Sequence, residues 1–198
     1  MRIKAILGVA FGLSTLPCLA GYLDDGIRSH ERRDYRNAAS AFRKASASGS
    51  AEAQRRLGFM FYHGEGVAQD NKQAVALFER AAEGGDVRSA ANLAKMYQYG
   101  MGVEQDDKRA ATWFRKAAEM GDAPSQFEMS IVYYKGEGAE RDRTEAAKWW
   151  TLAMSGGGEY AKRIRASVES AEAKLTPEEI AEGKRRAAEW LRSRETRK

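Results

Sequence analysis

The sequence predicts an all-α protein, namely a right-handed α-solenoid of stacked antiparallel helix pairs. Three observations predict this fold. Apolar residues recur at helical spacing, glycines punctuate the helices, and the whole pattern repeats every 36 residues within a chain of 198. Because repeats of this length stack only on their neighbours, the order of the segments along the chain is also their order in the stack.

The first twenty residues have the pattern of a secretory signal peptide. A positively charged start precedes an apolar run from Ala5 to Leu16, and small residues occupy Cys18 and Ala20, where a signal peptidase reads the chain. We therefore expect residues 1–20 to be removed by cleavage after Ala20 and the protein to be exported, either periplasmic or secreted. Two alternatives stay open: a retained membrane anchor, for which the apolar run is short, and lipid attachment at Cys18, which Pro17 disfavours.

Composition excludes several kinds of chemistry. Cys18 is the only cysteine, so a chain beginning at Gly21 has no disulfide, no thiol nucleophile and no thiolate metal site. Residues 21–158 hold as many acidic as basic residues, so the formal net charge of +5 comes from the two ends. No basic face is predicted, and we expect no nucleic-acid partner. Beyond the first twenty residues, no apolar stretch has the length of a transmembrane segment.

An internal repeat decides the architecture. Leu57, Leu93 and Met129 are 36 residues apart, and many other positions follow the same period. The further sets are Phe61, Tyr97 and Tyr133; Gly64, Gly100 and Gly136; Gly66, Gly102 and Gly138; Val67, Val103 and Ala139; Asp70, Asp106 and Asp142; Ala74, Ala110 and Ala146; Leu77, Trp113 and Trp149; Ala81, Ala117 and Ala153; and Gly85, Gly121 and Gly157. So many coincidences cannot come from composition alone, and we expect three successive units to share one structure.

Each unit is predicted to contain two helices. In the first unit, Ala53, Leu57 and Phe61 form an apolar stripe on the first helix. Gly64 ends that helix, since glycine readily adopts the left-handed conformation of a C-terminal cap. Val67 is then expected to fold back over the helix pair.

The second helix of a unit has its own start signal and stripe. Asp70 is expected to cap it, and Gln73, three residues on, to complete a capping box. Asp142 and Glu145 repeat this pair in the third unit. Apolar positions of these second helices, expected in the core, are Ala74, Leu77, Phe78, Ala81, Trp113, Phe114, Trp149 and Trp150. Small residues that are expected to let the two helices of a unit approach closely are Gly58, Ala94 and Ser130, facing Ala74, Ala110 and Ala146.

These positions resemble the Sel-1-like repeat, a 36-residue relative of the tetratricopeptide repeat. The first unit reads Leu57-Gly58-x-x-Phe61-x-x-Gly64-x-Gly66-Val67-x-x-Asp70-x-x-x-Ala74, and the second matches as well. The third departs mildly, with Met129-Ser130 and Ala139. The resemblance implies three repeats, over residues 51–86, 87–122 and 123–158.

A partial repeat is predicted before them, over residues 21–50. Its second helix matches the later units at Asp34, Ala38, Phe42, Ala45 and Gly49. Its first helix, about Leu23 to Arg32, lacks the Gly-x-Gly turn, as an N-terminal cap of a repeat array often does.

Residues 159–198 are predicted to form capping helices and a basic tail. A charged helix is expected from Tyr160 to Lys174, and Thr176 with Glu179 forms a capping box at the start of the last helix. Trp190 is expected to dock on the last repeat, which would otherwise expose its apolar side. The segment also resembles the Leu-Thr-Pro-x-x-Ile helix that often ends secreted bacterial members of the family.

Enzymatic constellations are nearly absent from the sequence. Only two histidines occur, His30 and His63, and no nucleophile elbow, phosphate-binding loop or zinc-protease motif is present. The Gly-x-Gly pairs lie between two helices, whereas a dinucleotide site needs one such loop after a strand. Asp70, Asp106 and Asp142 stand one repeat apart, so they cannot converge on one substrate. We expect no catalytic residue, no metal and no cofactor.

What remains is the surface of the first helices. In tetratricopeptide-like stacks, residues off the buried stripe of these helices line the concave face, and here they are aromatic or basic, the types that dominate binding hot spots. The candidate partner-binding residues are Arg55, Phe59, Tyr62, His63, Lys95, Gln98, Tyr99, Phe127, Ile131, Tyr134 and Lys135. Alternatively, several of them, Ile131 especially, only pack against neighbouring helices.

The sequence therefore predicts an exported, monomeric helical-repeat scaffold that binds a protein or peptide partner through its concave face, in the cell envelope. A cell-wall-directed hydrolase is the alternative. It lacks a nucleophile and base pair here, and the relatives with that suggested role are rich in cysteine. A purely structural spacer without a specific groove is the third interpretation.

Overall fold

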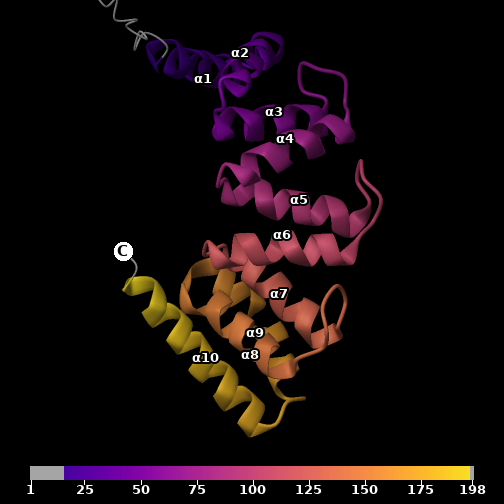
Figure 1. Ribbon diagram of the computed structural model, residues 1–198, viewed down its shortest axis with the longest axis vertical. Helices are drawn as coiled ribbons and strands as arrows, with labels where there is room; N and C mark the ends of the chain where they lie inside the picture. The colour runs from indigo at the N-terminus through magenta and orange to yellow at the C-terminus, as the bar shows by residue number, and fades with distance from the viewer. Residues whose placement is uncertain (1–15, 197–198) are drawn as a thin grey trace, which may run out of the picture.

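The computed structural model describes residues 16–196, and this part of the chain contains ten helices and no strand. In chain order the helices are α1 (Leu16–Glu31), α2 (Tyr35–Ala47), α3 (Ala51–His63), α4 (Asn71–Glu83), α5 (Val87–Tyr99), α6 (Asp107–Glu119), α7 (Ala123–Lys135), α8 (Arg143–Ser155), α9 (Gly158–Glu172) and α10 (Pro177–Glu195). Figure 1 shows them stacked along the long axis, with α10 running obliquely at the C-terminal end. The predicted all-α solenoid is confirmed.

The seven helices from α2 to α8 all have 13 residues, and equivalent helices start 36 residues apart. The longer Gly-x-Gly turns, which join the two helices of a unit, all lie on one side of the stack (Figure 1). Residues 36 positions apart therefore occupy equivalent places in successive units, and one unit can be compared with the next residue by residue.

The Gly-x-Gly turn contains two glycines with different roles. Gly64 has a φ of 74° and caps α3 by donating its N–H to the Met60 carbonyl oxygen, as predicted. Gly66, with a φ of 67°, lies so close to the start of α2 that a Cβ atom there would stand 2.3 Å from the Tyr35 carbonyl carbon. The second glycine of each turn thus packs one unit onto the second helix of the unit before it.

The aspartate caps form, but the capping boxes predicted at Asp70 and Asp142 are wrong. Asp70 accepts a hydrogen bond from the Gln73 backbone N–H (3.1 Å), as a cap should. Its own N–H, which the Gln73 side chain would have to bind, donates to the Phe61 carbonyl oxygen (2.9 Å) instead. Gln73 donates to the Asp70 carboxylate (2.9 Å). The Asp70 N–H, which a capping box needs, is therefore already used in the hydrogen bond that closes the turn between α3 and α4.

The third unit departs from the predicted box in the same way. The Asp142 N–H donates to the Tyr133 carbonyl oxygen (3.0 Å), and Asp142 caps α8 through the Glu145 N–H (2.8 Å). The Glu145 carboxylate pairs with Lys148 on its own helix and with Arg186 of α10.

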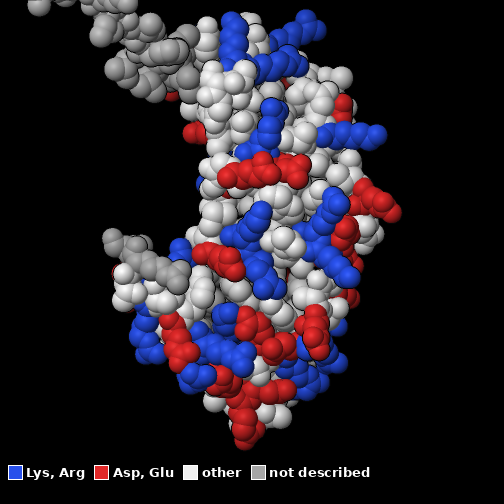
Figure 2. Space-filling view, viewed as in Figure 1, with Lys and Arg blue, Asp and Glu red and all other residues white. Residues whose placement is uncertain are grey.

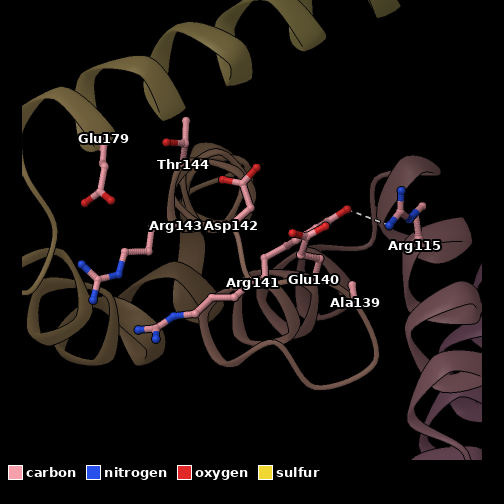
Figure 3. Close-up of a pocket in the computed structure, with 9 residues that line it drawn as sticks. Arg115, Ala139, Glu140, Arg141, Asp142, Arg143, Thr144 and Glu179 are labelled. Atoms are coloured by element: carbon pink, nitrogen blue, oxygen red, sulfur yellow. Dashed lines mark hydrogen bonds between the residues drawn. The ribbon is translucent and has the colours of Figure 1, made fainter.

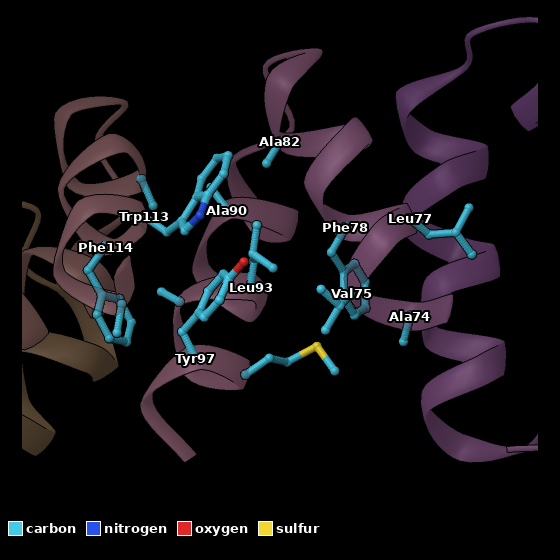
Figure 4. Close-up of a cluster of buried hydrophobic side chains, with 14 of the residues drawn as sticks. Ala74, Val75, Leu77, Phe78, Ala82, Ala90, Leu93, Tyr97, Trp113 and Phe114 are labelled. Atoms are coloured by element: carbon cyan, nitrogen blue, oxygen red, sulfur yellow. The ribbon is translucent and has the colours of Figure 1, made fainter. Parts of the chain in front are cut away.

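The core runs continuously through the stack. Figure 4 shows Phe78, Leu93 and Trp113, from α4, α5 and α6, in the buried cluster between the helices. Gly58 admits the ring of Phe78, because a Cβ at this glycine would stand 2.9 Å from the ring atom Cε1. The small residue of the first helix thus accommodates an aromatic ring. The tryptophans predicted to be core, Trp113, Trp149 and Trp150, are all buried.

The N-terminal helix begins earlier than expected. α1 starts at Leu16 instead of about Leu23, and it connects to α2 without a Gly-x-Gly turn, as predicted. In this shorter connection Arg33 takes the left-handed conformation, with a φ of 60°. Most of the predicted signal peptide lies outside the described residues. None of the described helices combines the length and the apolar character that crossing a bilayer requires.

The C-terminal helices cover the last repeat. Trp190 packs edge-on against Trp149, with ring centroids 6.4 Å apart, which confirms its predicted docking. The predicted capping box at Thr176 is also present, since Thr176 N–H donates to the Glu179 carboxylate and Glu179 N–H donates to the Thr176 hydroxyl. α9 packs its apolar side chains, among them Ile164, against a separate cluster around Trp150.

Candidate functional site

The candidate site is the surface formed by the off-stripe residues of α3, α5 and α7, which we call the first-helix face. All the predicted partner-binding residues lie on these three helices. Four of them are exposed, His63, Lys95, Tyr99 and Lys135. The other seven are partly buried, so their contacts decide how much of each is free to meet a partner.

An aromatic cluster lies where α3 meets α5. Phe59 packs edge-on against Phe78, with ring centroids 5.1 Å apart, and is nearly parallel to the His63 ring at 6.2 Å. The Tyr62 ring meets His63 at 4.9 Å. The Tyr62 hydroxyl contacts the Met101 sulfur at 3.6 Å, across the junction to the next unit. Three of the predicted residues therefore form one contiguous surface.

A small cavity of about 80 Å³ opens beside this cluster. Phe59 and Tyr62 line it from α3, and Asn92, Lys95 and Met96 line it from α5. Met101, in the turn after α5, closes one side. Asn92 and Met101 were not among the predicted residues. Their period partners in the first unit are Arg56 and Glu65, so the repeat comparison offered no consistent signal for them.

Tyr99 is the most exposed large hydrophobic side chain of the face. It lies at the C-terminal end of α5 with 67% of its surface accessible, in the position that His63 holds one repeat earlier. A tyrosine ring that no other element covers is available to a partner, and aromatic rings contribute strongly at binding surfaces.

Arg55 has its charge paired inside the protein. Its Nε donates to the Asp86 carboxylate at 3.1 Å, and the two side chains are only 14% and 18% exposed. Asp86 also caps α5 through the Ser89 N–H (2.7 Å). Arg55 therefore ties α3 to the start of α5 and is not a free cation on the face.

The third unit contributes less open surface than the first two. Phe127 and Tyr134 pack against the cluster that contains Ile164 and Val168 of α9. Ile131 is partly buried, and Lys135 is exposed and pairs with Glu137 at 3.4 Å. The accessible aromatic surface is thus concentrated on α3 and α5.

One titratable group of the face was missed by the sequence analysis. Glu128 of α7 is partly buried, and burial raises the pKa of its carboxyl, while the nearby positive charges of Lys95 and Lys135 act to lower it. Burial also raises the pKa of the Tyr160 phenol to about 12, with the Glu128 charge adding to the shift. The positive charges of Lys95 and Lys135 therefore act on a carboxylate that is poorly solvated.

A larger polar pocket lies away from this face, beside the turn between α7 and α8. Its volume is about 870 Å³, and Arg115, Tyr133, Arg143 and Glu179 are among its lining residues. Arg115 donates to the Tyr133 hydroxyl at 2.7 Å. Figure 3 shows Arg115 on one side of the pocket and Glu179 on the other. The described residues that line it include no histidine, cysteine or serine.

The described residues also contain no group of three or more His, Cys, Asp or Glu side chains that could hold a metal ion. In the view of Figure 2, basic and acidic side chains are interspersed over α7 to α10.

Comparison with solved structures shows similar folds. The chain is similar to c5321, a protective antigen present in uropathogenic Escherichia coli strains and displaying an SLR fold, with 30% identity and a TM-score of 0.73. That match covers 86% of this chain and 38% of the E. coli protein. The chain is also similar to a Sel1 repeat protein from Oxalobacter formigenes, with 27% identity, a TM-score of 0.68 and coverage of 85% of this chain and 66% of that one.

This chain spans under half the length of the E. coli protein and about two thirds of the Oxalobacter protein. No curated protein matches the chain. The sequence model of the Sel1 repeat matches residues 51–86, 87–122 and 123–157. Because these three segments make up more than half of the chain and coincide with its helix pairs, the protein belongs to the Sel1 repeat family.

Proposed function

We propose that this protein is an exported scaffold that binds a protein or peptide partner through its first-helix face, in the cell envelope. Sel1 repeat proteins are generally scaffolds for protein interaction and are typically not enzymes. The proposal adds the face, the residues and the location.

The observation that carries the proposal is the accessible aromatic surface on α3 and α5. Phe59, Tyr62 and His63 form one cluster beside a small cavity, and Tyr99 lies exposed one repeat further along. Rigid aromatic rings bury much surface at a low cost in side-chain entropy, and an adjacent cavity offers room for an apolar anchor of the partner.

The charged residue beside the cavity indicates which side chains the partner presents. Lys95 lines the cavity and is exposed, so a carboxylate placed beside the apolar anchor has a cation within reach. An extended segment or helix with an aliphatic or aromatic side chain next to an acidic one fits this surface. The export part of the proposal rests on the signal-peptide pattern of residues 1–20.

Photo-crosslinking in cells tests the face. A photoreactive amino acid at Tyr99 is expected to capture a partner, whereas the same group at Lys108, exposed on α6, is expected to capture none. Tyr99→Ala is then expected to reduce partner binding to the purified protein while the helical circular dichroism spectrum is unchanged. Equal capture from both positions would show that α3 and α5 are not the binding surface.

Two further measurements test export to the cell envelope and the hydrolase alternative. Cell fractionation followed by N-terminal sequencing is expected to find an envelope protein that begins at Gly21. A hydrolysis screen with cell-wall fragments is expected to give no turnover, and turnover that survives stringent purification would favour the hydrolase alternative.

A further inference from the structure

The docking of α10 reveals what the surface between two second helices can bind. α10 crosses α8 at Gly183, where a Cβ atom would stand 2.4 Å from the Ala147 Cβ. Trp190 then packs against Trp149, and Arg194 reaches the end of α6, where its Nη1 donates to the Glu119 carbonyl oxygen at 2.9 Å. A helix therefore lies along α8 and ends on α6.

The same surface recurs, without a helix on it, two units earlier. The bounds of α2, α3 and α4 stand 72 residues before those of α6, α7 and α8, so α2 and α4 form the equivalent pair. A groove of about 310 Å³ lies between them. Its lining residues are Arg43, Ser46 and Ala47 of α2, Leu57 and Phe61 of α3, and Gln73, Ala76, Leu77 and Arg80 of α4.

The positions of this α2–α4 groove match the positions that α10 contacts. Ala47 corresponds to Glu119, which accepts the hydrogen bond from Arg194. Ala76 corresponds to Lys148, whose backbone nitrogen lies beside Gly183, and Leu77 corresponds to Trp149. Ala47 and Ala76 are exposed and carry only a methyl group, so the side chains leave room where a helix would lie.

The α4–α6 groove lies in the stack between the α2–α4 groove and the surface that α10 covers. Side chains of the protein itself already cover this groove. In the α4–α6 pair, the Lys116 ammonium lies 3.9 Å from the centre of the Trp113 ring. Arg109 lies over the Tyr97 ring at 5.5 Å and donates to its hydroxyl at 3.4 Å. The equivalents of these two residues in the α2–α4 groove are Arg80 and Gln73, and neither lies over a ring in the described part of the chain. The Phe61 ring, the counterpart of Tyr97, is instead approached by Arg43.

Charge identifies the kind of helix that fits. Arg43 and Arg80 are exposed on opposite walls of the α2–α4 groove, and neither forms an ion pair with a residue that the structure describes. The Arg43 guanidinium lies 5.7 Å from the centre of the Phe61 ring, so its charge stands beside the apolar floor. A carboxylate next to an apolar stripe would therefore meet a cation on each wall.

α10 itself fits this groove poorly. Its Arg186 pairs with Glu145 (3.4 Å), and the corresponding residue of the groove is the neutral Gln73. In its own site, Leu191 of α10 lines a cavity with Leu152, and the residue of the groove that corresponds to Leu152 is Arg80. A second copy of α10 would therefore place an apolar side chain against an arginine. The groove therefore favours a helix with more acidic side chains than α10 presents.

We propose that the α2–α4 groove binds an amphipathic helix of a partner protein, with an apolar stripe over Leu57, Phe61 and Leu77 and acidic side chains toward Arg43 and Arg80. The walls of this groove are the second helices α2 and α4, so it is a second binding surface in addition to the first-helix face. Acidic residues beside an apolar stripe would pair with both arginines while the stripe covers the groove floor.

A designed peptide tests the proposal with the full chain. The probe is the 19-residue α10 sequence, Pro177–Glu195, carrying Leu191→Glu so that a carboxylate faces Arg80, with a fluorophore at its N-terminus. We expect fluorescence anisotropy to show saturable binding of this probe. The unchanged α10 peptide is expected to bind at least about tenfold more weakly.

Two variants and a control locate the bound peptide. Ala76→Arg, which fills the groove from an exposed position, and Arg80→Glu are each expected to weaken binding of the probe by about tenfold or more. Arg88→Glu, a matched charge reversal at an exposed residue of α5, is expected to leave binding unchanged.

The other outcomes overturn the proposal. If the unchanged α10 peptide binds as tightly as the probe, the groove accepts a second copy of this chain in place of an acidic partner. If no peptide binds, or if binding is insensitive to Ala76→Arg but lost with Tyr99→Ala, the α2–α4 groove is not a helix-binding site. A failure of peptide binding at the α2–α4 groove leaves partner capture through Tyr99 as a separate test, so the two proposals can fail independently.

Discussion

The guanidinium of Arg194 donates a hydrogen bond to the main-chain carbonyl oxygen of Glu119, 75 residues earlier in the chain (2.9 Å). A second nitrogen of the same side chain approaches the Met120 carbonyl oxygen (3.4 Å), and the guanidinium lies over the Trp190 ring at 4.7 Å. Since the last carbonyls of a helix have no partner within it and carry partial negative charge, Arg194 caps α6 while it holds the end of α10.

Replacing this arginine should loosen α10 without unfolding the repeats. Arg194→Ala removes the hydrogen bonds to α6, and we expect it to lower the free energy of unfolding by about 1 kcal/mol, since the contact is partly solvated. Hydrogen exchange should accelerate in the last turns of α10 and stay unchanged in α3 to α5. Arg192→Ala, exposed two residues earlier, is the control; equal loss of protection in both variants would contradict the capping role.

Gly183 is expected to be essential for the docking of α10. By helix propensity alone, Gly183→Ala would stabilise α10 by roughly 1 kcal/mol. The added Cβ would instead meet Ala147 Cβ at 2.4 Å and the Lys148 backbone nitrogen at 2.9 Å, so we expect a net loss of about 1–3 kcal/mol from the forced separation of α10 and α8. Chemical denaturation measures it.

Gly156→Ala is the matched control for Gly183. Gly156 has a φ of −71°, and a Cβ atom added there would have no neighbouring atom within 4 Å, so an alanine meets neither strain nor a steric clash. We expect a change within about 1 kcal/mol, in the stabilising direction, because alanine restricts the unfolded chain. A similar loss of stability at both glycines would mean that the approach of α10 to α8 is not what makes Gly183 necessary.

The periodic part of this structure could be predicted from the sequence because its signals are local. The stripe of Leu57 and Phe61, the stop at Gly64 and the cap at Asp70 all act within a few residues of one another. Repetition of these signals gave the solenoid. The capping box at Asp70 was predicted wrongly, because the Phe61 carbonyl oxygen, nine residues away, competes for the Asp70 N–H.

The candidate site was predictable only in part. The helical spacing correctly assigned Phe59, Tyr62 and Tyr99 to first helices, but it could not show that Arg55 is paired with Asp86. Nor could it show where α10 goes, because an apolar stripe around Trp190 fits any groove between two second helices. Such features depend on contacts between residues that are distant in sequence, and no local pattern records them.

Gly66 and Gly85 separate backbone strain from steric contact. Both have positive φ, 67° and 87°, but a Cβ at Gly66 would stand 2.3 Å from the Tyr35 carbonyl carbon, whereas one at Gly85 would meet nothing within 4 Å. We expect Gly85→Ala to cost about 1 kcal/mol from its left-handed conformation. Gly66→Ala should cost roughly 3 kcal/mol, because overpacking against α2 is added. Equal costs in thermal or chemical unfolding would show that the turn does not hold the two units together.

Glu128 should make stability depend on pH in an unusual direction for a carboxylate. Burial raises its pKa in the folded protein above the ordinary value of 4.5. The unfolded chain therefore releases this proton first as pH rises. Well below pH 4.5 the Glu128 carboxyl does not change the free energy of unfolding. As pH rises through the folded pKa, the carboxyl lowers that free energy, and the full loss is present above the folded pKa.

Glu128→Gln removes the charge, and we expect it to raise the melting temperature at neutral pH and to have little effect at acid pH. Glu137→Gln, at an exposed carboxylate of the same region, should show no such pH-dependent gain. If Glu128→Gln lowers the melting temperature at neutral pH, attraction to Lys95 and Lys135 outweighs burial, and the sign assigned to this group is wrong.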